Sequence, residues 1–216
     1  MTMQKSSEAL IAELVSELEP VRPLRFGEGL ALALAAAGLS ALLVVWLTGV
    51  RADLMAGEIS PMALVANGLY LGLGLAASVT VVVMSRPQIG SDHSGWRWAA
   101  GMAGLLPLAG AIVATGRGTA MRAAEGAAHE LWCVASGMGA SLLVFAALTL
   151  WLRRGAPTSP ERAGLVTGIA AGAFGIAAFS LHCGDDDIVH LGLWHSATVV
   201  AMAALGRAFV PRLIRW

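Results

Sequence analysis

Six apolar runs constrain this chain more than any other feature, because each is about 20 residues long, the length that crosses the hydrocarbon core of a bilayer. The segments between them are short and carry most of the charges. Lipid offers backbone groups no water to bond with, so each run is predicted to be an α-helix. We therefore expect an all-α polytopic membrane protein, a bundle of six transmembrane helices over about 28–49, 62–84, 97–115, 131–151, 163–182 and 188–210.

Composition agrees with a lipid environment. Of 216 residues, 57% are hydrophobic and 13% are charged, whereas soluble domains carry about 25% charged residues. The net charge is zero, so nothing favours direct binding to nucleic acid. The two cysteines, Cys133 and Cys183, are too few for a disulfide scaffold and form no CxxC motif.

The basic residues predict the orientation of the bundle. Cytoplasmic segments of membrane proteins are enriched in Lys and Arg. If the N-terminus is cytoplasmic, eleven of these residues lie inside and three outside, so both termini are predicted to be cytoplasmic. The inner group is Lys5, Arg22, Arg25, Arg86, Arg97, Arg153, Arg154, Arg162, Arg207, Arg212 and Arg215, and the outer group is Arg51, Arg117 and Arg122.

Small residues and prolines predict how the helices pack. Gly164, Gly168 and Gly172 share one helix face, and small residues at this spacing let helices approach closely. This favours packing inside the bundle, with a homodimer as the alternative. A kink is expected at Pro107, and Pro61 suits a first-turn position.

The stretch 180–195, "SLHCGDDDIVHLGLWH", concentrates the chelating and redox-active groups. The predicted topology places Cys133 and Cys183 at the same membrane face. Two chemistries fit: a disulfide, or a site for a thiophilic metal ion such as zinc, cadmium or copper. In the plainer alternative, the aspartates cap the sixth helix and His190 and His195 are ordinary interfacial residues. The candidate metal ligands are Cys133, Cys183, His129, His182, Asp186 and His190.

The N-terminal segment "SSEALIAELVSELEPVRPL" predicts a separate amphipathic helix, capped by Ser6 or Ser7 and ended by Pro20. Its other face is acidic, which disfavours anionic lipid and favours a protein groove. The alternative is a helix folded against the inner loops of its own bundle. The apolar stripe expected to bind a partner is Leu10, Ile11, Leu14, Val15 and Leu18.

The chain resembles the NrsF-like anti-sigma factors over essentially its whole length. The resemblance rests on "LIAELVSELEPVRPL", "GVRADL", "SRPQIG", the stretch from "LRRGAPTSPERAGLVTG" to "HCGDDDIVHLGLWH", and the terminal "LIRW". It implies a six-helix protein of the bacterial inner membrane that holds an extracytoplasmic-function (ECF) sigma factor inactive. It also implies that Cys133 and Cys183 carry the signal, which the family links to heavy metals or oxidation.

Together these features predict a regulator and not an enzyme. Residues 1–26 are expected to form a cytoplasmic sigma-factor-binding tail, and residues 27–216 a transmembrane sensor domain in contact with lipid. No cofactor is expected to be obligatory, and the thiophilic metal ion considered above is an optional ligand of the cysteine site. The alternatives are a membrane thiol–disulfide redox enzyme, which usually needs a CxxC pair, and a metal transporter, which normally has charged side chains mid-membrane.

Overall fold

The computed structural model describes residues 6–18, 23–86, 95–116 and 127–214. The described residues are helical and contain no strand, which confirms the all-α fold. Six helical segments are long and apolar enough to cross a membrane, and each overlaps one predicted run. They are Phe26–Thr48, Pro61–Met84, Gly95–Gly116, Ala128–Arg153, Pro160–Phe179 and His190–Leu213.

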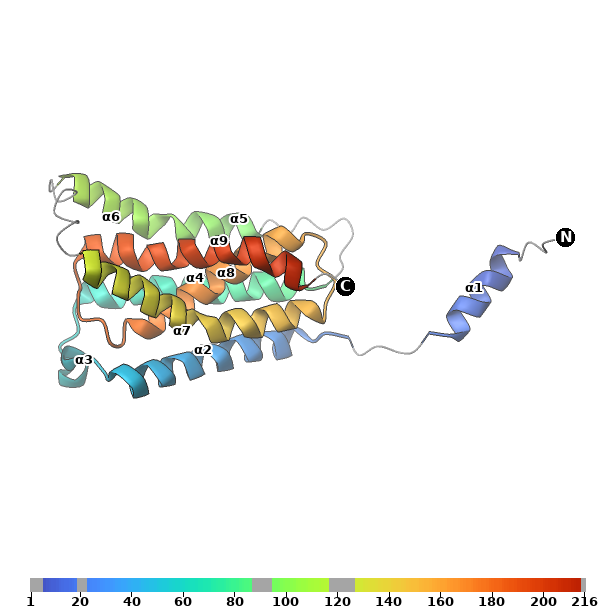
Figure 1. Cartoon of the computed structure of the whole chain (residues 1–216), viewed down its shortest axis with the longest axis horizontal. Helices are drawn as coiled ribbons and strands as arrows, with labels where there is room; N and C mark the ends of the chain where they lie inside the picture. Colours follow the sequence, from blue (N-terminus) through green and yellow to red (C-terminus); the bar gives the residue numbers. More distant parts are fainter. Residues whose placement is uncertain (1–5, 19–22, 87–94, 117–126, 215–216) are drawn as a thin grey trace.

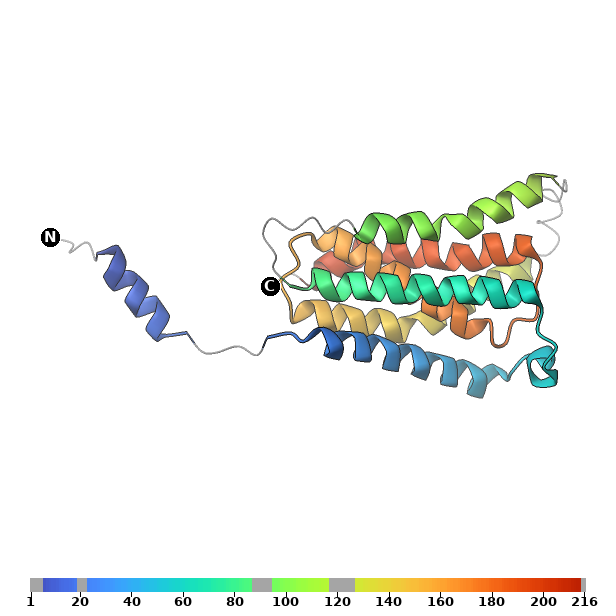
Figure 2. The ribbon, with the colours of Figure 1, turned by 180° about the vertical axis from the view of Figure 1, so that it is seen from behind.

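The six spans run side by side as one bundle (Figure 1). The view of Figure 1 shows one side of the bundle, which is formed by α2 (Phe26–Thr48), α7 (Ala127–Arg153) and α9 (Ser196–Leu213). From behind, α4 (Pro61–Met84) lies in front, with the pair α5 (Gly95–Ala103) and α6 (Leu105–Gly116) above it (Figure 2). The start of α2 and the C-terminus lie at one end, here called the tail end, and the short helix α3 (Ala52–Ala56) lies at the opposite end, here called the thiol end.

The centre of the bundle is α8 (Pro160–Phe179), whose residues from Ala163 to Phe179 are nearly all buried. Gly164, Gly168 and Gly172 face α9 so closely that a Cβ atom on any of them would collide with the α9 backbone. These glycines therefore let α8 and α9 pack backbone to backbone, which is the first of the two uses considered for them.

Both prolines act as predicted. Pro61 is the first residue of α4, and the Ser60 side chain caps that helix by accepting from the Ala63 N–H at 3.1 Å. The third span breaks after Ala103, where α5 ends and α6 begins. Ala103 is four residues before Pro107, and the proline ring clashes with the carbonyl at that position. The kink therefore lies one turn before the proline itself.

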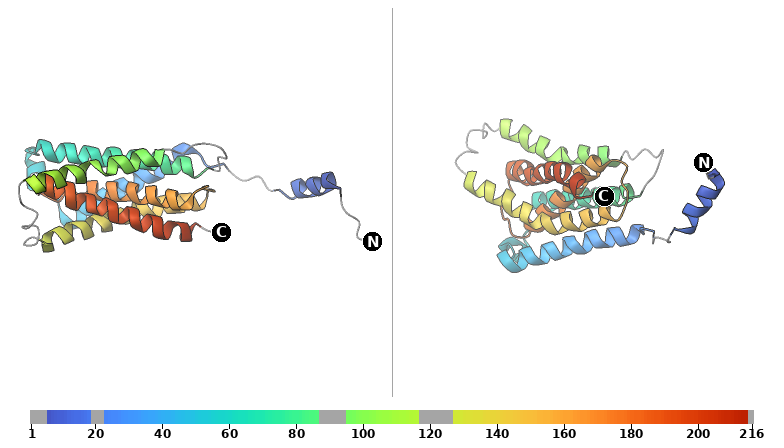
Figure 3. Two further views of the ribbon diagram at one scale, coloured as in Figure 1. Left: turned by 90° about the horizontal axis from the view of Figure 1, so that it is seen from above. Right: turned by 45° about the vertical axis from the view of Figure 1, so that its right-hand side comes forward.

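The N-terminal helix α1 (Ser7–Ser16) stands away from the bundle in every view (Figure 3). Ser6 is its N-cap, with Oγ accepting from the Ala9 N–H at 3.3 Å. No residue of α1 is buried, so the helix does not fold against its own bundle here. Pro20, expected to end the helix, lies outside the described residues. The predicted stripe, Leu10, Ile11, Leu14, Val15 and Leu18, is exposed.

Candidate thiol and metal site

The two cysteines meet inside the thiol end of the bundle. Cys133 lies in the second turn of α7, and Cys183 follows the end of α8 by four residues. Their Sγ atoms are 3.7 Å apart, both thiols are free, and the residues are 1% and 6% exposed. The shared membrane face predicted from topology therefore becomes direct contact between the two sulfur atoms.

Two histidines join the thiols because the sixth span begins with a π-helical turn, η2 (His190–His195). In an α-helix, residues five apart point about 140° away from one another, since each residue advances about 100°. The i→i+5 pattern of a π-turn brings such residues to nearly the same side, and such turns occur often at functional sites. The rings of His190 and His195 consequently lie 4.9 Å apart between centroids, and both residues are buried.

Neighbouring helices hold the π-turn. The hydroxyl of Tyr70, the one tyrosine of the chain, donates to the Leu191 carbonyl at 2.8 Å and lies 3.0 Å from Ser196 Oγ. Gly192 faces Gly110 of α6 so closely that a Cβ on either would approach the other's Cα to within 2.9 Å. Glycine at both positions therefore permits the backbone contact that seats the turn against α6.

His190 links the thiols to a carboxylate. Its Nε2 lies 3.5 Å from Cys183 Sγ, and its Nδ1 lies 2.7 Å from Glu130 Oε2 and 3.5 Å from Asp185 Oδ2. A carboxylate beside Nδ1 favours the proton on that nitrogen, so Nε2 is left with its lone pair toward the sulfur. Glu130 thus orients His190 toward the cysteines.

His195 is the second buried histidine of this region. Its side chain is 1% exposed, and neither ring nitrogen has a hydrogen-bond partner among the described residues. A buried polar group without a partner costs about 1–3 kcal/mol. The ring instead faces those of His190 and Tyr70, with centroids 4.9 and 6.3 Å away.

The electrostatics favour a thiolate at Cys183. A hydrogen bond from the Cys133 thiol holds the pKa of Cys183 well below its ordinary value, and the contact with His190 acts in the same direction. Burial acts in the opposite direction, because it penalises the charged form. Thiolate is the reactive form of cysteine toward both oxidants and metals.

The buried side chain of Arg51 connects two loops at the thiol end of the bundle. Arg51, 7% exposed, donates to both carboxylate oxygens of Asp53 at 2.7 and 2.6 Å and to Asp186 Oδ1 at 2.8 Å. Its backbone N–H also donates to the Leu181 carbonyl at 2.9 Å. The α3 loop and the 180–189 loop are thereby joined close to Cys183. The hydrogen bonds from Arg51 hold the pKa of Asp53 below its ordinary value.

A cavity of about 210 Å³ opens beneath this arginine. Arg51, Asn67, Cys183 and His195 are among the residues that line it. The Asn67 side-chain oxygen is buried and has no hydrogen-bond partner among the described residues. The cavity gives small solutes a route toward the sulfur of Cys183.

Among the predicted ligands, the structure brings together Cys133, Cys183 and His190. Exposed His129 lies beside them, its ring 5.8 Å from that of His190 between centroids. Two others point elsewhere, because His182 contacts the Gly49 carbonyl and Asp186 pairs with Arg51. Of the aspartates, Asp187 acts as the predicted cap, accepting from the Val189 N–H at 2.7 Å.

The sequence contains no signal for Glu130, and its pattern leaves His195 outside the candidate ligands, with an ordinary interfacial role as the plainer interpretation. His195 joins the cluster through the π-turn, and Glu130 joins it through its contact with His190. A hint is nevertheless present in the sequence. Two histidines five apart in an apolar span are unusual, because buried polar groups are costly there.

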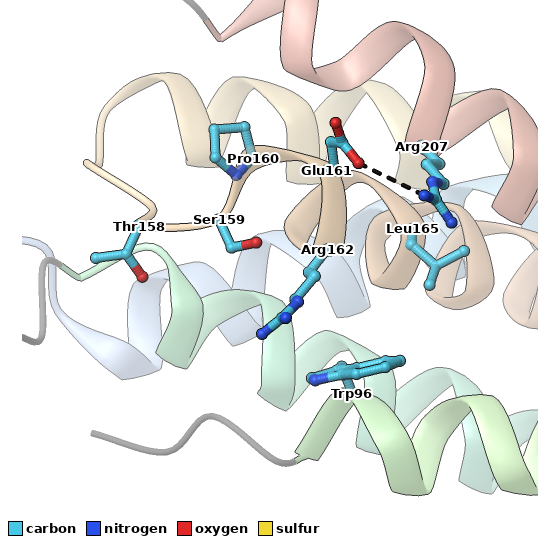
Figure 4. Close-up of a pocket in the computed structure, with 8 residues that line it drawn as sticks. All are labelled: Trp96, Thr158, Ser159, Pro160, Glu161, Arg162, Leu165 and Arg207. Atoms are coloured by element: carbon cyan, nitrogen blue, oxygen red, sulfur yellow. Dashed lines mark ion pairs between the residues drawn. The ribbon is translucent and has the colours of Figure 1, made fainter. Parts of the chain in front are cut away.

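A second hollow, of about 520 Å³, lies at the tail end (Figure 4). Arg162 extends over the ring of Trp96, with its Cζ 5.4 Å from the centroid, and Arg207 lies 3.6 Å from Glu161. The hollow contains no cysteine or histidine. It adds basic groups to the tail end and takes no part in the thiol site.

Comparison with known proteins places the chain in a family. A model of the NrsF family, described as "Negative regulator of sigma F", matches residues 14–216. The anti-sigma-F factor NrsF of Caulobacter vibrioides (strain NA1000 / CB15N) is 35% identical over 217 residues, covering 97% of both chains. A probable anti-sigma-F factor NrsF of Azospira oryzae is 29% identical over 87% of both chains. No solved structure matches. The chain therefore belongs to the NrsF family of negative regulators of a sigma factor.

Proposed function

We propose that this protein is a bacterial inner-membrane anti-sigma factor that holds an ECF sigma factor through its N-terminal tail. It releases the sigma factor when Cys133 and Cys183, on the side of the membrane away from the cytoplasm, are oxidised or take up a heavy metal. The observation that carries the proposal is the pair of sulfur atoms 3.7 Å apart, at the opposite end of the bundle from the tail.

The tail is suited to hold a partner. Leu10, Ile11 and Leu14 are 48%, 58% and 57% exposed although they lie on one face of a capped helix. Such a stripe is the usual ligand of an apolar groove on another protein. Anti-sigma activity in relatives supports a sigma factor as that protein. The proposed tail comprises residues 1–26, and the sensor comprises residues 27–216.

The charge distribution supports a cytoplasmic tail end. Arg86, Arg153, Arg154, Arg162 and Arg207 border the helix ends on that side. On the thiol end, the described arginine is Arg51, and it is neutralised by two carboxylates. This asymmetry follows the positive-inside rule. Lys5, Arg22, Arg117, Arg122 and Arg215, which entered the prediction, lie outside the described residues.

Formation of a disulfide bond between Cys133 and Cys183 requires little movement of the two side chains. A disulfide bond is about 2.05 Å long, so the sulfur atoms would close by roughly 1.7 Å. With a peroxide as oxidant, the two S–H bonds break and one S–S bond forms. The two electrons and two protons reduce the peroxide to two hydroxyl products, water in the case of hydrogen peroxide.

α7 offers the route from the thiols to the tail. Cys133 and Trp151 lie on this helix about 27 Å apart. Along the way Ser40 of α2 donates to the Ala140 carbonyl of α7 at 2.6 Å. Near the tail end, Trp151 packs against Gly29, in the first turns of α2, and donates through Nε1 to Ser85 Oγ at 3.1 Å. A shift of α7 therefore acts on the helix that leads into the tail.

Complete release of the sigma factor requires a large difference in free energy between the two states of the protein. Reversing a 1:99 equilibrium to 99:1 requires a difference of about 5.5 kcal/mol between the two states. A covalent S–S bond, or metal bound by two thiolates in one state, is of sufficient strength. The chain has no CxxC pair of the kind that thiol–disulfide enzymes use, and this favours a sensor over a catalyst.

The proposal is tested by measuring how much sigma factor the protein retains after exposure to an oxidant or a metal. Full-length protein, immobilised in detergent with its bound sigma factor, is exposed to peroxide or to cadmium, and the released sigma factor is measured. Wild type should release it, whereas Cys133→Ser and Cys183→Ser should retain it. His182→Ala is the matched control, since this half-buried neighbour of Cys183 lies outside the thiol cluster. Release from both serine variants at the wild-type level would refute the switch.

Orientation is tested separately in a chain lacking both native cysteines. A cysteine placed at Met55, which is 75% exposed at the thiol end, should react with an impermeant thiol reagent outside the cytoplasmic membrane of intact cells. A cysteine placed at Ser7 in the tail should react only after the cells are opened. The reverse pattern would refute the proposed orientation.

A further inference from the structure

We propose that Cys133, Cys183, His190 and His195 form one four-coordinate site for a divalent d10 cation of the zinc and cadmium type, and that Glu130 supports it through His190. The site deepens the proposed function and rests on it only for its regulatory meaning, because it names the metal ligands of the sensor. One ligand atom from each of the four residues lies within 4.8 Å of all the others, and all four residues are buried.

Two distances in the structure match the edges of a tetrahedron. With Zn–S bonds of about 2.3 Å and Zn–N bonds of about 2.0–2.1 Å, tetrahedral ligands lie about 3.8 Å apart for S···S and about 3.6 Å for S···N. The structure has 3.7 Å between the two Sγ atoms and 3.5 Å between Cys183 Sγ and His190 Nε2. Two of the edges of the site therefore already have the length that one ion requires, and the remaining ligand atoms lie within 4.8 Å of one another.

His195 is the natural fourth ligand. It is 1% exposed, and neither of its ring nitrogens has a hydrogen-bond partner among the described residues. The π-turn that places it against the thiols is itself held by the hydroxyl of Tyr70. A ring nitrogen of His195 lies within 4.8 Å of both sulfur atoms and of the His190 ligand nitrogen, which leaves it available to a metal ion bound by the other three residues.

Glu130 supplies the support that metal-bound histidines usually have. Ligating histidines commonly give their second ring nitrogen to a carboxylate, which fixes the tautomer and the ring orientation. Glu130 Oε2 lies 2.7 Å from His190 Nδ1, on the side of the ring away from Cys183. The remaining nitrogen, Nε2, is the one that faces the sulfur.

The charges and the access route also fit a divalent ion. Two thiolates balance its charge, and neutral imidazoles add none, so the filled inner site carries no net charge where water is scarce. The cavity of about 210 Å³ under Arg51 reaches Cys183 and His195. A competing group of three residues contains no sulfur, and two of its members, His129 and Asp185, are exposed, while the third, His190, is buried and shared with the inner site.

The test measures metal binding by the purified full-length chain, reduced and stripped with a chelator, without any sigma factor. Cadmium should bind at one ion per chain with thiolate-to-metal charge-transfer absorption. Cobalt(II) should show the intense visible bands of tetrahedral coordination. Binding should release protons, because thiols ionise as they ligate. Weak octahedral cobalt bands, or cadmium binding without charge-transfer absorption, would overturn the assignment.

Variants separate the inner site from the surface group. His195→Ala should weaken cadmium binding by more than about 100-fold, and Glu130→Gln by about 10- to 100-fold. His129→Ala and His182→Ala, the matched controls, should bind as wild type does. Should His195→Ala fail to fold, His195→Cys answers the question, since a third thiolate should retain cadmium and increase the charge-transfer absorption. If His129→Ala loses cadmium binding and His195→Ala keeps it, the assignment of the metal to the inner site is refuted.

The two proposals fail in different ways. If the chain binds no metal but peroxide still releases the sigma factor through the cysteines, the metal site is refuted and the anti-sigma switch stands. If one cadmium binds at the four ligands but the chain retains no sigma factor, the anti-sigma proposal is refuted and the metal site stands.

Discussion

The apolar stripe of the tail gives the most direct test of how the partner is held, and Leu14→Glu is the sharpest change. Leu14 lies in the middle of the stripe and is 57% exposed, so docking can bury more than half of its surface. Burying a whole leucine is worth about 1.5–3 kcal/mol, and this fraction corresponds to about 1–2 kcal/mol. A carboxylate left unpaired in the same groove adds a cost of about 1–3 kcal/mol or more.

Leu14→Glu is therefore expected to weaken the complex by about 2–5 kcal/mol, which raises the Kd for the sigma factor at least roughly 30-fold. The matched control is Ala9→Glu. Ala9 lies on the opposite face of the same helix, three residues after the cap Ser6, where glutamate is compatible with the N-terminus of the helix. The control adds the same charge and should leave the Kd unchanged.

The assay is titration of the purified sigma factor against each full-length variant in detergent, with circular dichroism to confirm equal helix content. If Leu14→Glu and Ala9→Glu bind the sigma factor equally well, the stripe is not the binding face. If both weaken binding by the same factor, the effect comes from charge and not from apolar burial, and the reasoning is again refuted.

Three further predictions concern the bundle. Gly168→Ala forces α8 away from α9, an overpacking cost of about 1–3 kcal/mol that should lower the Tm in detergent, whereas Gly139→Ala, with nothing within 4 Å, should not. The pKa of Asp53 is depressed in the folded state. The ion pair with Arg51 therefore stabilises the fold fully at pH values above the pKa of Asp53 in the unfolded chain, which is about 3.9. This stabilisation is lost as the pH falls through the lower pKa of the folded state. Arg51→Gln should flatten this acid limb of a Tm-against-pH curve, and an unchanged limb would contradict it. Trp151→Leu loosens the contact with α2, so peroxide should still oxidise the thiols but release less sigma factor; release equal to wild type would exclude α7 as the route.

Periodicity and length were enough to predict the fold. All six spans, the first-turn role of Pro61 and the close packing at Gly168 follow from local chemistry, and each is present in the structure. Such features depend on a helix and its immediate neighbour. The short helix α3 was not predicted, because its five residues carry too little pattern.

The site was predictable only in part. The sharing of one membrane face by Cys133 and Cys183 follows from counting spans, and the 3.7 Å contact agrees with it. The participation of His195 does not follow, because α-helical periodicity directs residues 190 and 195 apart. A π-turn depends on tertiary contacts, here the hydroxyl of Tyr70 and the close approach of Gly110 and Gly192. Neither contact can be read from local sequence.

The π-turn distinguishes the two proposed signals, metal binding and oxidation. A metal at the thiols would bind ligands from α7, from the loop after α8 and from η2, so its coordination would fix three elements relative to one another. A disulfide would fix only α7 and the loop, and would leave η2 free. Metal and oxidant would then strain the bundle differently at the thiol end while sharing α7 as their path to the tail. The two signals share α7 and the loop after α8, and of these two α7 is the one whose Ala140 carbonyl and Trp151 contact α2, so a tail that responds to both signals is expected to do so through movement of α7.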